Sequence, residues 1–213
     1  MKKWYETAGD REQVAVSSRI RLARNVKTMP FPGHETEAQA RELVGACRTA
    51  LCGEKKPAGV SYLEMDRVTP VQKRCLVESN LISPDFEGQT SPCALYLSDD
   101  ERLSVMVNEE DHLRIQVLGR GLALSECLDR ANELDDRVSE ALPIAFSESF
   151  GYLTHCPTNV GTGLRASVML HLPALGATGR LKEVLESASK MGLAVRGAFG
   201  EGSESEAGLI QLS

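Results

Sequence analysis

Two arginines stand two residues apart in the segment 17–24, which reads SSRIRLAR. On an extended strand, Arg19 and Arg21 would point from the same face, because side chains alternate along a strand. Two guanidinium forks on one face match the oxygen atoms of phosphate groups. The segment alone leaves a second interpretation open, in which both arginines belong to a solvated basic surface.

The segment 108–114, NEEDHLR, places three carboxylates, an imidazole and a guanidinium between two apolar strands. In a site, one of the carboxylates could orient or deprotonate a substrate while Arg114 faces an anion. The alternative is an exposed hairpin tip, where acidic residues are easily solvated. His112 is expected to be a local hydrogen-bonding residue rather than a catalyst.

The segment 156–165, CPTNVGTGLR, predicts a tight loop that runs into an apolar strand. Its glycines would let the backbone approach a ligand closely, and Arg165 stands where the loop meets the strand. The Gly-Lys-Ser/Thr ending of a P-loop is absent. Cys156 has two interpretations, a thiol whose pKa is lowered by nearby arginines or a small buried apolar residue.

The segment 196–202, RGAFGEG, combines glycines with Arg196 and Glu201. This composition suits a lid that closes over a nucleotide, with the arginine on phosphate. A plain surface loop fits the same composition.

Regular elements must position these segments. Apolar spacing predicts helices over 35–51, 124–142 and 181–191, the last ending near Gly192. Short apolar runs predict strands at 94–97, 103–107, 113–118, 166–172 and 209–212. Because strands and helices mix without a βαβ rhythm, the fold class is expected to be α+β around a largely antiparallel sheet flanked by helices.

Composition narrows the function. The 213 residues have 42% apolar content and a net charge of −6, which suits a globular domain and argues against direct nucleic-acid binding. No stretch has the apolar length of a membrane span. The six cysteines form no CxxC pair and the histidines lie apart from them, so neither a zinc site nor another protein-held metal is expected. Free thiols in a reducing cytoplasm are the expected state.

The segment 108–114 is similar, almost letter for letter, to a signature of the ATP:guanidino phosphotransferases, the phosphagen kinases that include arginine and creatine kinases. The run CPTNVGTGLRASVMLHLP at 156–173 resembles the family's second signature. Both stand in the family's order, and the resemblance covers essentially the whole chain. It implies the glutamine-synthetase-like catalytic domain of these kinases.

Within this family the chain most resembles the bacterial protein arginine kinases. The segments 81–84 (LISP), 98–101 (SDDE) and 200–203 (GEGS) indicate this subgroup. Kinases of small guanidino compounds carry a helical domain of about a hundred residues ahead of the catalytic one. Here the catalytic domain is expected to begin the chain, which would leave the site open to an arginine within a protein.

The resemblance also implies residue roles. Five arginines match those that hold the ATP phosphates, with Mg²⁺ bound through the phosphates: Arg19, Arg21, Arg114, Arg165 and Arg196. Glu110 matches the carboxylate that binds the substrate guanidinium and accepts its proton, and Glu201 matches a second such carboxylate. Cys156 matches a reactive cysteine that tunes rate and substrate position.

Several features depart from the family pattern. Met169 stands where a histidine usually lies beside adenine, and Phe199 replaces a small or basic loop residue. The catalytic domain, residues 1–213, is expected to be truncated at its C-terminal end, without the phosphoarginine-binding domain of the bacterial enzymes.

The function implied is phosphorylation of protein arginines, which marks proteins for a Clp-type unfoldase and protease and inactivates a heat-shock repressor in a stress response. An activator protein is a further implied partner. Two alternatives stay open: a kinase of free arginine or another small guanidino compound, and a non-catalytic regulator that binds nucleotide or phosphoarginine.

Overall fold

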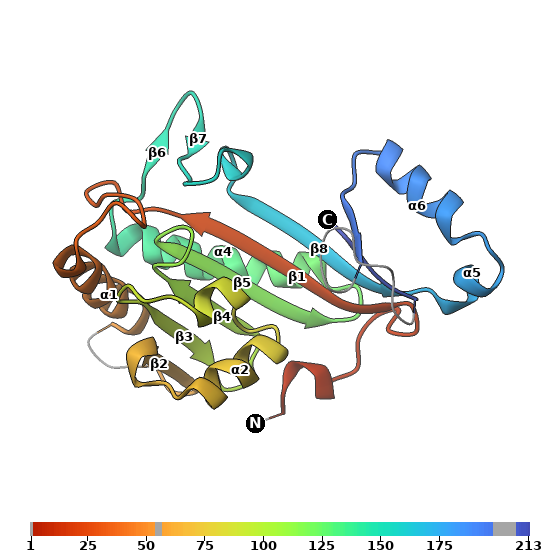
Figure 1. Cartoon of the computed structure of the whole chain (residues 1–213), viewed down its shortest axis with the longest axis horizontal. Helices are drawn as coiled ribbons and strands as arrows, with labels where there is room; N and C mark the ends of the chain where they lie inside the picture. Colours follow the sequence, from red (N-terminus) through yellow and green to blue (C-terminus); the bar gives the residue numbers. More distant parts are fainter. Residues whose placement is uncertain (1, 54–56, 198–207) are drawn as a thin grey trace.

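A single twisted sheet organises the computed structural model, which describes residues 2–53, 57–197 and 208–213 (Figure 1). In the described residues the sheet has eight strands in the order β2-β3-β4-β5-β1-β8-β10-β9, and each neighbouring pair is antiparallel. The strands are β1 (Ala15–Arg24), β2 (Val60–Glu64), β3 (Ala94–Ser98), β4 (Leu103–Val107), β5 (Leu113–Arg120), β8 (Leu164–His171), β9 (Val195–Gly197) and β10 (Leu209–Leu212). The α+β class and the antiparallel sheet are therefore confirmed.

Helices cover the two faces of the sheet unequally. The long helices α1 (Glu37–Cys52) and α4 (Leu124–Ala141) pack on one face, where α4 runs along β1 and β5 (Figure 1). On the other face, a second apolar cluster around Phe86 and Met106 joins the sheet to short elements near β3 and β4. These are η2 (Met65–Arg67), α2 (Pro70–Glu78) and α3 (Pro84–Glu87). Among the described residues, no helix covers the centre of the sheet on that second face (Figure 1).

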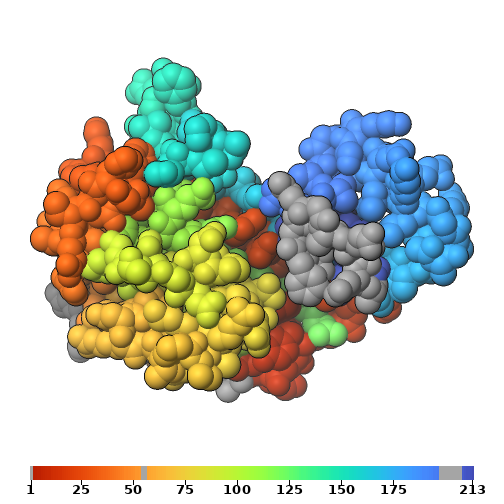
Figure 2. Space-filling model, viewed as in Figure 1, coloured from red at the N-terminus to blue at the C-terminus, as the bar shows by residue number. Residues whose placement is uncertain are grey.

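The remaining elements lie at the ends of the molecule. A small hairpin, β6 (Phe146–Ser147) and β7 (Gly151–Tyr152), projects from the body beside η3 (Pro157–Asn159) (Figure 2). At the opposite end, α5 (Pro173–Ala177) and α6 (Leu181–Lys190) connect β8 to β9. None of the helices in the described part of the chain has the length and apolar character needed to cross a membrane.

Local sequence explains why the helices begin where they do. Thr36 caps α1 by accepting a hydrogen bond from the backbone N–H of Gln39, whose side chain binds back to Thr36. Thr69 and Gln72 form the same capping box at α2, which starts with a proline at its first position. The apolar spacing had predicted α1, α4 and α6. Helix α2 was missed because none of its residues is buried, so it carries no clear apolar stripe.

Strand β1 lies at the centre of the sheet and shows opposite chemistry on its two faces. Ile20 and Leu22 are each 2% exposed and pack with α1 and α4. The alternate residues Arg19 and Arg21 face the other way, as the hypothesis of an extended strand requires. Arg24, although charged, lies on the apolar side and is 3% exposed.

A buried ion pair accommodates Arg24 in this apolar layer. Its Nε lies 2.9 Å from Oδ1 of Asp135 on α4, and its Nη2 lies 2.7 Å from Oδ2. Asp135 is itself buried. Two parallel hydrogen bonds from one guanidinium to one carboxylate give the strongest geometry for such a pair. The pair fixes the end of β1 to the middle of α4.

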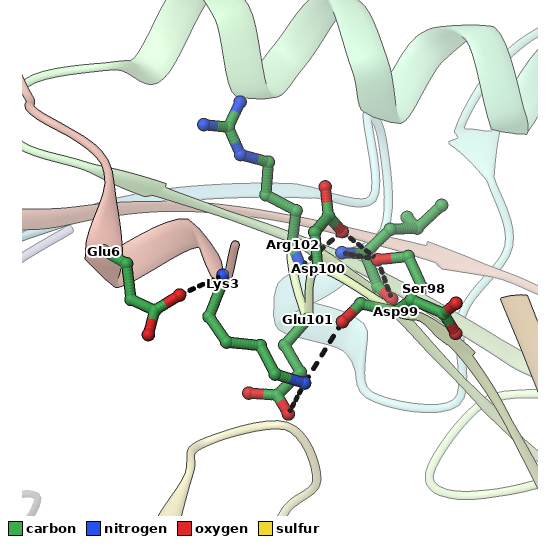
Figure 3. Close-up of polar contacts among 8 residues, drawn as sticks. Lys3, Glu6, Ser98, Asp99, Asp100, Glu101 and Arg102 are labelled. Carbon is green, nitrogen blue, oxygen red and sulfur yellow. Dashed lines mark hydrogen bonds and ion pairs between the residues drawn. The ribbon is translucent and has the colours of Figure 1, made fainter. Parts of the chain in front are cut away.

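The acidic run at 98–101 has a structural explanation (Figure 3). It forms the turn between β3 and β4 and holds the N-terminal segment. The Lys3 ammonium lies 2.6 Å from the Glu101 carboxylate and 3.1 Å from the Asp99 carbonyl oxygen. The Trp4 backbone N–H donates to the Asp100 carbonyl, and the Asp100 carboxylate accepts from Ser98. The run also contacts α4, because Arg130 lies 3.5 Å from the Asp100 carboxylate.

We expect Asp135→Asn to lower the free energy of unfolding by about 3–5 kcal/mol, because it leaves the Arg24 charge buried without a counter-charge. Urea denaturation at neutral pH measures the change. Glu37→Gln is the control, since it breaks an exposed ion pair with Arg41 and should leave stability nearly unchanged. Equal losses in the two variants would contradict the importance assigned to the buried pair.

Candidate active site

Four arginines from three neighbouring strands project from the face of the sheet opposite α4. Residues that lie directly opposite one another in an antiparallel pair point to the same side. Arg21 of β1 lies opposite Arg165 of β8, and Ala23 of β1 lies opposite Arg114 of β5. Arg19, two residues from Arg21, shares that side. Long-range pairing thus gathers positive charge that is scattered in the sequence.

The same row of pairings extends to the far edge of the sheet. Arg196 of β9 lies opposite Gln211 of β10, and Gln211 lies opposite Met169 of β8. Met169 in turn faces Ser17 of β1, so Arg196 lies on the arginine side as well. The Gln211 side chain accepts a hydrogen bond of 3.0 Å from Arg19. Met169, the departure from the family pattern, therefore lies on the arginine side of the sheet.

A cleft opens over this arginine face, with a volume of about 160 Å³. The molecular surface in Figure 2 is hollowed between the projecting hairpin and α6. The cleft brings together five of the predicted site residues: Arg21, Glu110, Arg114, Cys156 and Arg165. Arg19 and Arg196 share the face but do not line the cleft.

The arginines of this face are partly buried and repel one another. Burial, followed by repulsion from Arg114 and Arg165, lowers the pKa of the Arg19 guanidinium to about 10. Burial, followed by repulsion from Arg19 and these same arginines, lowers the pKa of Arg21 to about 8. Within the described residues, the Nε of Arg21 is buried without a hydrogen-bond partner. An anion in the cleft would raise the pKa of both arginines by stabilising their charged forms, so this face is suited to a polyanion.

Glu109 orients one of these arginines, a role that the sequence did not reveal. Its carboxylate is 8% exposed and lies 2.6 Å from Nη1 of Arg114, while Ser83 donates a second hydrogen bond. Burial opposes ionisation of Glu109, but the Arg114 charge and these hydrogen bonds outweigh it and lower its pKa. Ser83 belongs to the LISP segment and also caps α3. In the sequence, nothing distinguishes Glu109 from the adjacent Glu110.

Glu110 is the exposed residue of an otherwise buried turn. Its neighbours Asn108, Glu109, Asp111 and His112 are all buried. The interpretation as an exposed hairpin tip is therefore wrong for the turn as a whole. Glu110 and Asp111 both line the cleft, but only Glu110 is exposed, and the buried polar groups hold the turn in place.

Two of these neighbours fasten the turn to distant segments. Asp111 accepts hydrogen bonds from Asn25 at 2.6 Å and from the His155 backbone N–H at 2.7 Å. The His112 ring accepts from the Val26 backbone N–H at its Nδ1, which leaves Nε2–H to donate to the Pro30 carbonyl. Burial lowers the pKa of His112, which favours this neutral form. The local hydrogen-bonding role predicted for His112 is confirmed.

Cys156 stands at the start of η3, half-buried, with its Sγ 3.0 Å from the Thr158 hydroxyl. It lines the cleft rather than the core, so the interpretation as a buried apolar residue is wrong. Glu201 and Phe199 lie outside the described residues. No group of three or more histidine, cysteine or acidic side chains in the described ranges is arranged to hold a metal ion.

Comparison with known proteins places this geometry in a family. Residues 42–213 match the model of the ATP:guanido phosphotransferase C-terminal catalytic domain. Protein-arginine kinases from Caldanaerobacter subterraneus subsp. tengcongensis and Desulforamulus reducens are 47% and 48% identical over 95% and 99% of the chain. The chain spans 60% of the length of each of these relatives.

Solved structures show the same fold. A substrate-free duplicated taurocyamine kinase from Schistosoma mansoni superposes with a TM-score of 0.80 at 25% identity, covering 100% of this chain and 32% of that one. Lombricine kinase gives 0.82 at 23% identity, covering 96% and 60% of the two chains, and this likeness concerns the fold alone. Because the family model matches most of the chain, residues 42–213, the chain belongs to the ATP:guanido phosphotransferase family.

Proposed function

We propose that the protein transfers the γ-phosphate of ATP to the guanidinium groups of arginine residues in proteins. The observation that carries this proposal is the cleft in which Glu110 faces Arg21, Arg114 and Arg165. Such a cleft combines sites for a polyanion and for a cation. Relatives named protein-arginine kinase, at 45–48% identity, support the choice of arginine in proteins as acceptor.

The arginine face would hold the nucleotide phosphates. Strand pairing fixes the backbone positions of these arginines, and Glu109 also holds the Arg114 guanidinium, which reduces the reorganisation needed when the phosphates bind. The unpartnered Nε of Arg21 fits a phosphate oxygen. Arg19 and Arg196 extend the charge towards the side of Met169. Magnesium bound through the phosphates would supply further charge neutralisation.

Glu110 would prepare the acceptor. A substrate guanidinium is protonated and is a poor nucleophile until a carboxylate aligns it and takes a proton. In the transfer, a guanidinium nitrogen bonds to the γ-phosphorus, the bond from phosphorus to the ADP oxygen breaks, and the nitrogen's proton passes to Glu110. Glu201 is proposed as a second carboxylate, and Cys156 as a contact that tunes the position of the acceptor.

The biological setting proposed for this reaction follows from the resemblance to bacterial protein arginine kinases. Phosphorylated proteins would pass to a Clp-type unfoldase, a heat-shock repressor would be one target, and an activator protein would stimulate the kinase. We place the reaction in the cytoplasm, where the thiols of this chain would stay reduced.

A kinase of small guanidino compounds is the second candidate, because a taurocyamine kinase shares 27% identity and a TM-score of 0.81 with this chain. Incubation with ATP, Mg²⁺ and an arginine-rich protein should form acid-labile phosphate on the protein, since P–N bonds hydrolyse in acid. Free arginine should be phosphorylated at least about tenfold more slowly, because it lacks the flanking binding energy. Equal rates would favour the second candidate, and nucleotide binding without transfer would indicate a non-catalytic regulator.

Glu110→Gln should lower kcat at least about a thousandfold, because an amide cannot accept the guanidinium proton. Its unfolding midpoint and its affinity for Mg-ADP should stay close to those of the unchanged protein, since the side chain is exposed. Glu148→Gln is the control, because Glu148 is exposed on the hairpin and does not line the cleft. Retention of full activity by Glu110→Gln would show that another group accepts the proton.

Arg21→Met should raise the free energy of unfolding by about 1 kcal/mol while weakening Mg-ADP binding about tenfold to a hundredfold. It removes a buried charge that its neighbours repel, but also a phosphate contact. Urea denaturation and titration calorimetry measure the two effects. Arg74→Met, which changes an exposed ion pair, should alter neither quantity. A loss of stability in Arg21→Met would mean that the arginine contributes more packing than repulsion.

A further inference from the structure

Besides Asp135 of α4, Arg24 contacts Tyr152, which lies on β7. Its guanidinium carbon lies 3.5 Å from the centre of the Tyr152 ring, within the range of a cation–π contact. The Nη1 atom of Arg24 donates hydrogen bonds to the carbonyl oxygens of Ala23 at 2.8 Å and Thr162 at 3.1 Å. One buried side chain therefore joins β1 and α4 to both residues that flank the loop 153–161.

This loop forms one wall of the cleft. Cys156, Thr158 and Asn159 line the cleft, as does Gly163 just beyond the loop. Tyr152 and Gly161 close the loop through two backbone hydrogen bonds, of 2.8 and 3.3 Å. Because Arg24 touches Tyr152 before the loop and Thr162 after it, the guanidinium holds both ends of the loop, while Asn25 and Asp111 hold its backbone at Leu153 and His155.

Gly163 shows how tightly this junction is packed. A Cβ atom at this position would lie 2.6 Å from Nη1 of Arg24 and 2.7 Å from the Ala23 carbonyl oxygen. The backbone there has φ +59°, a conformation that glycine adopts without strain. The Gly163 carbonyl also accepts from the Ala23 N–H at 2.8 Å. The loop can approach β1 this closely because the residue has no side chain.

We propose that Arg24 and Tyr152 are positioning residues, which hold Cys156 and its loop at a fixed place opposite Glu110. Neither residue lines the cleft, so neither would touch substrate. The contacts that carry this inference stand independently of the reaction, while its catalytic consequence rests on the proposed function. The inference predicts that loss of the Tyr152 ring moves the cysteine loop without disturbing the arginines on the strands.

Thiol alkylation of the full chain tests this without turnover. Cys156 is half-buried, and Cys75 is exposed on α2, away from the loop, and serves as an internal control. Burial raises the pKa of Cys93 and Cys127 to about 11, so these thiols should react slowly at pH 8. Iodoacetamide labelling followed by mass spectrometry gives a rate for each cysteine.

Three variants separate the ring from the hairpin. Tyr152→Leu should speed alkylation of Cys156 about fivefold or more, because the loop loses its aromatic anchor. Tyr152→Phe keeps the ring and should behave as the unchanged protein. Phe150→Leu, at a position 67% exposed at the hairpin tip, is the matched control and should also change nothing. Cys75 should react at one rate throughout.

Kinetics then test the consequence for the reaction. Tyr152→Leu should lower kcat about tenfold while the KM for ATP changes less than about twofold, because a small misplacement at the acceptor is costly and the phosphate contacts persist. Tyr152→Phe should have the same kcat as the unchanged protein. If wild-type protein transfers no phosphate, the proposed function fails, and the alkylation rates alone decide the inference.

Two results would overturn the inference that Arg24 and Tyr152 position the cysteine loop. One is an unchanged Cys156 rate in Tyr152→Leu. The other is faster alkylation of Cys93 and Cys127 together with Cys156, because this would show general loosening of the fold rather than displacement of one loop.

Discussion

Mutual repulsion among half-buried arginines is the constraint to which the rest of this structure responds. Arg19 and Arg21 stand on one strand with Arg114 and Arg165 beside them, so their separations are set by the pairing of three strands. Such a cluster persists because the opposite face of the same strands is apolar and packs on α1 and α4. Glu109 offsets part of the charge at one end, through Arg114. The remaining positive charge is left directed into the cleft, where a polyanion would compensate it.

The sequence predicted much of the frame and the chemistry because these depend on local patterns. Apolar spacing was enough for α1, α4 and α6, and the spacing of Arg19 and Arg21 indicated that the two would share one face of an extended strand. The strand order could not be predicted in this way, because it depends on contacts between residues far apart in the sequence. Nothing near residue 21 indicates that Arg165 lies opposite it. The common face of the five arginines therefore emerged only from the register.

Residues that support others were the ones that sequence reasoning missed. Arg24 continues the basic pattern of residues 19 and 21, yet points to the other face and binds Asp135. Its spacing of three from Arg21 indicates the change of face, but not the carboxylate, 111 positions away, that makes burial possible. Glu109 was overlooked beside Glu110 for a related reason. Two adjacent glutamates look equivalent in a sequence, whereas the turn buries one and exposes the other.

The carboxylate of Asp111 has a consequence for how this protein can change. One of its oxygens accepts hydrogen bonds from Asn25, which follows β1, and from the backbone N–H of His155, which precedes Cys156. The Asn25 side-chain oxygen accepts a hydrogen bond from the backbone N–H of His112. A substitution at Asn25 or Asp111 removes one buried hydrogen bond from the other residue, although Asp111 keeps the His155 N–H and Asn25 keeps the Leu153 carbonyl. The two positions are therefore expected to be energetically coupled, so the stability cost of changing both differs from the sum of the two single changes.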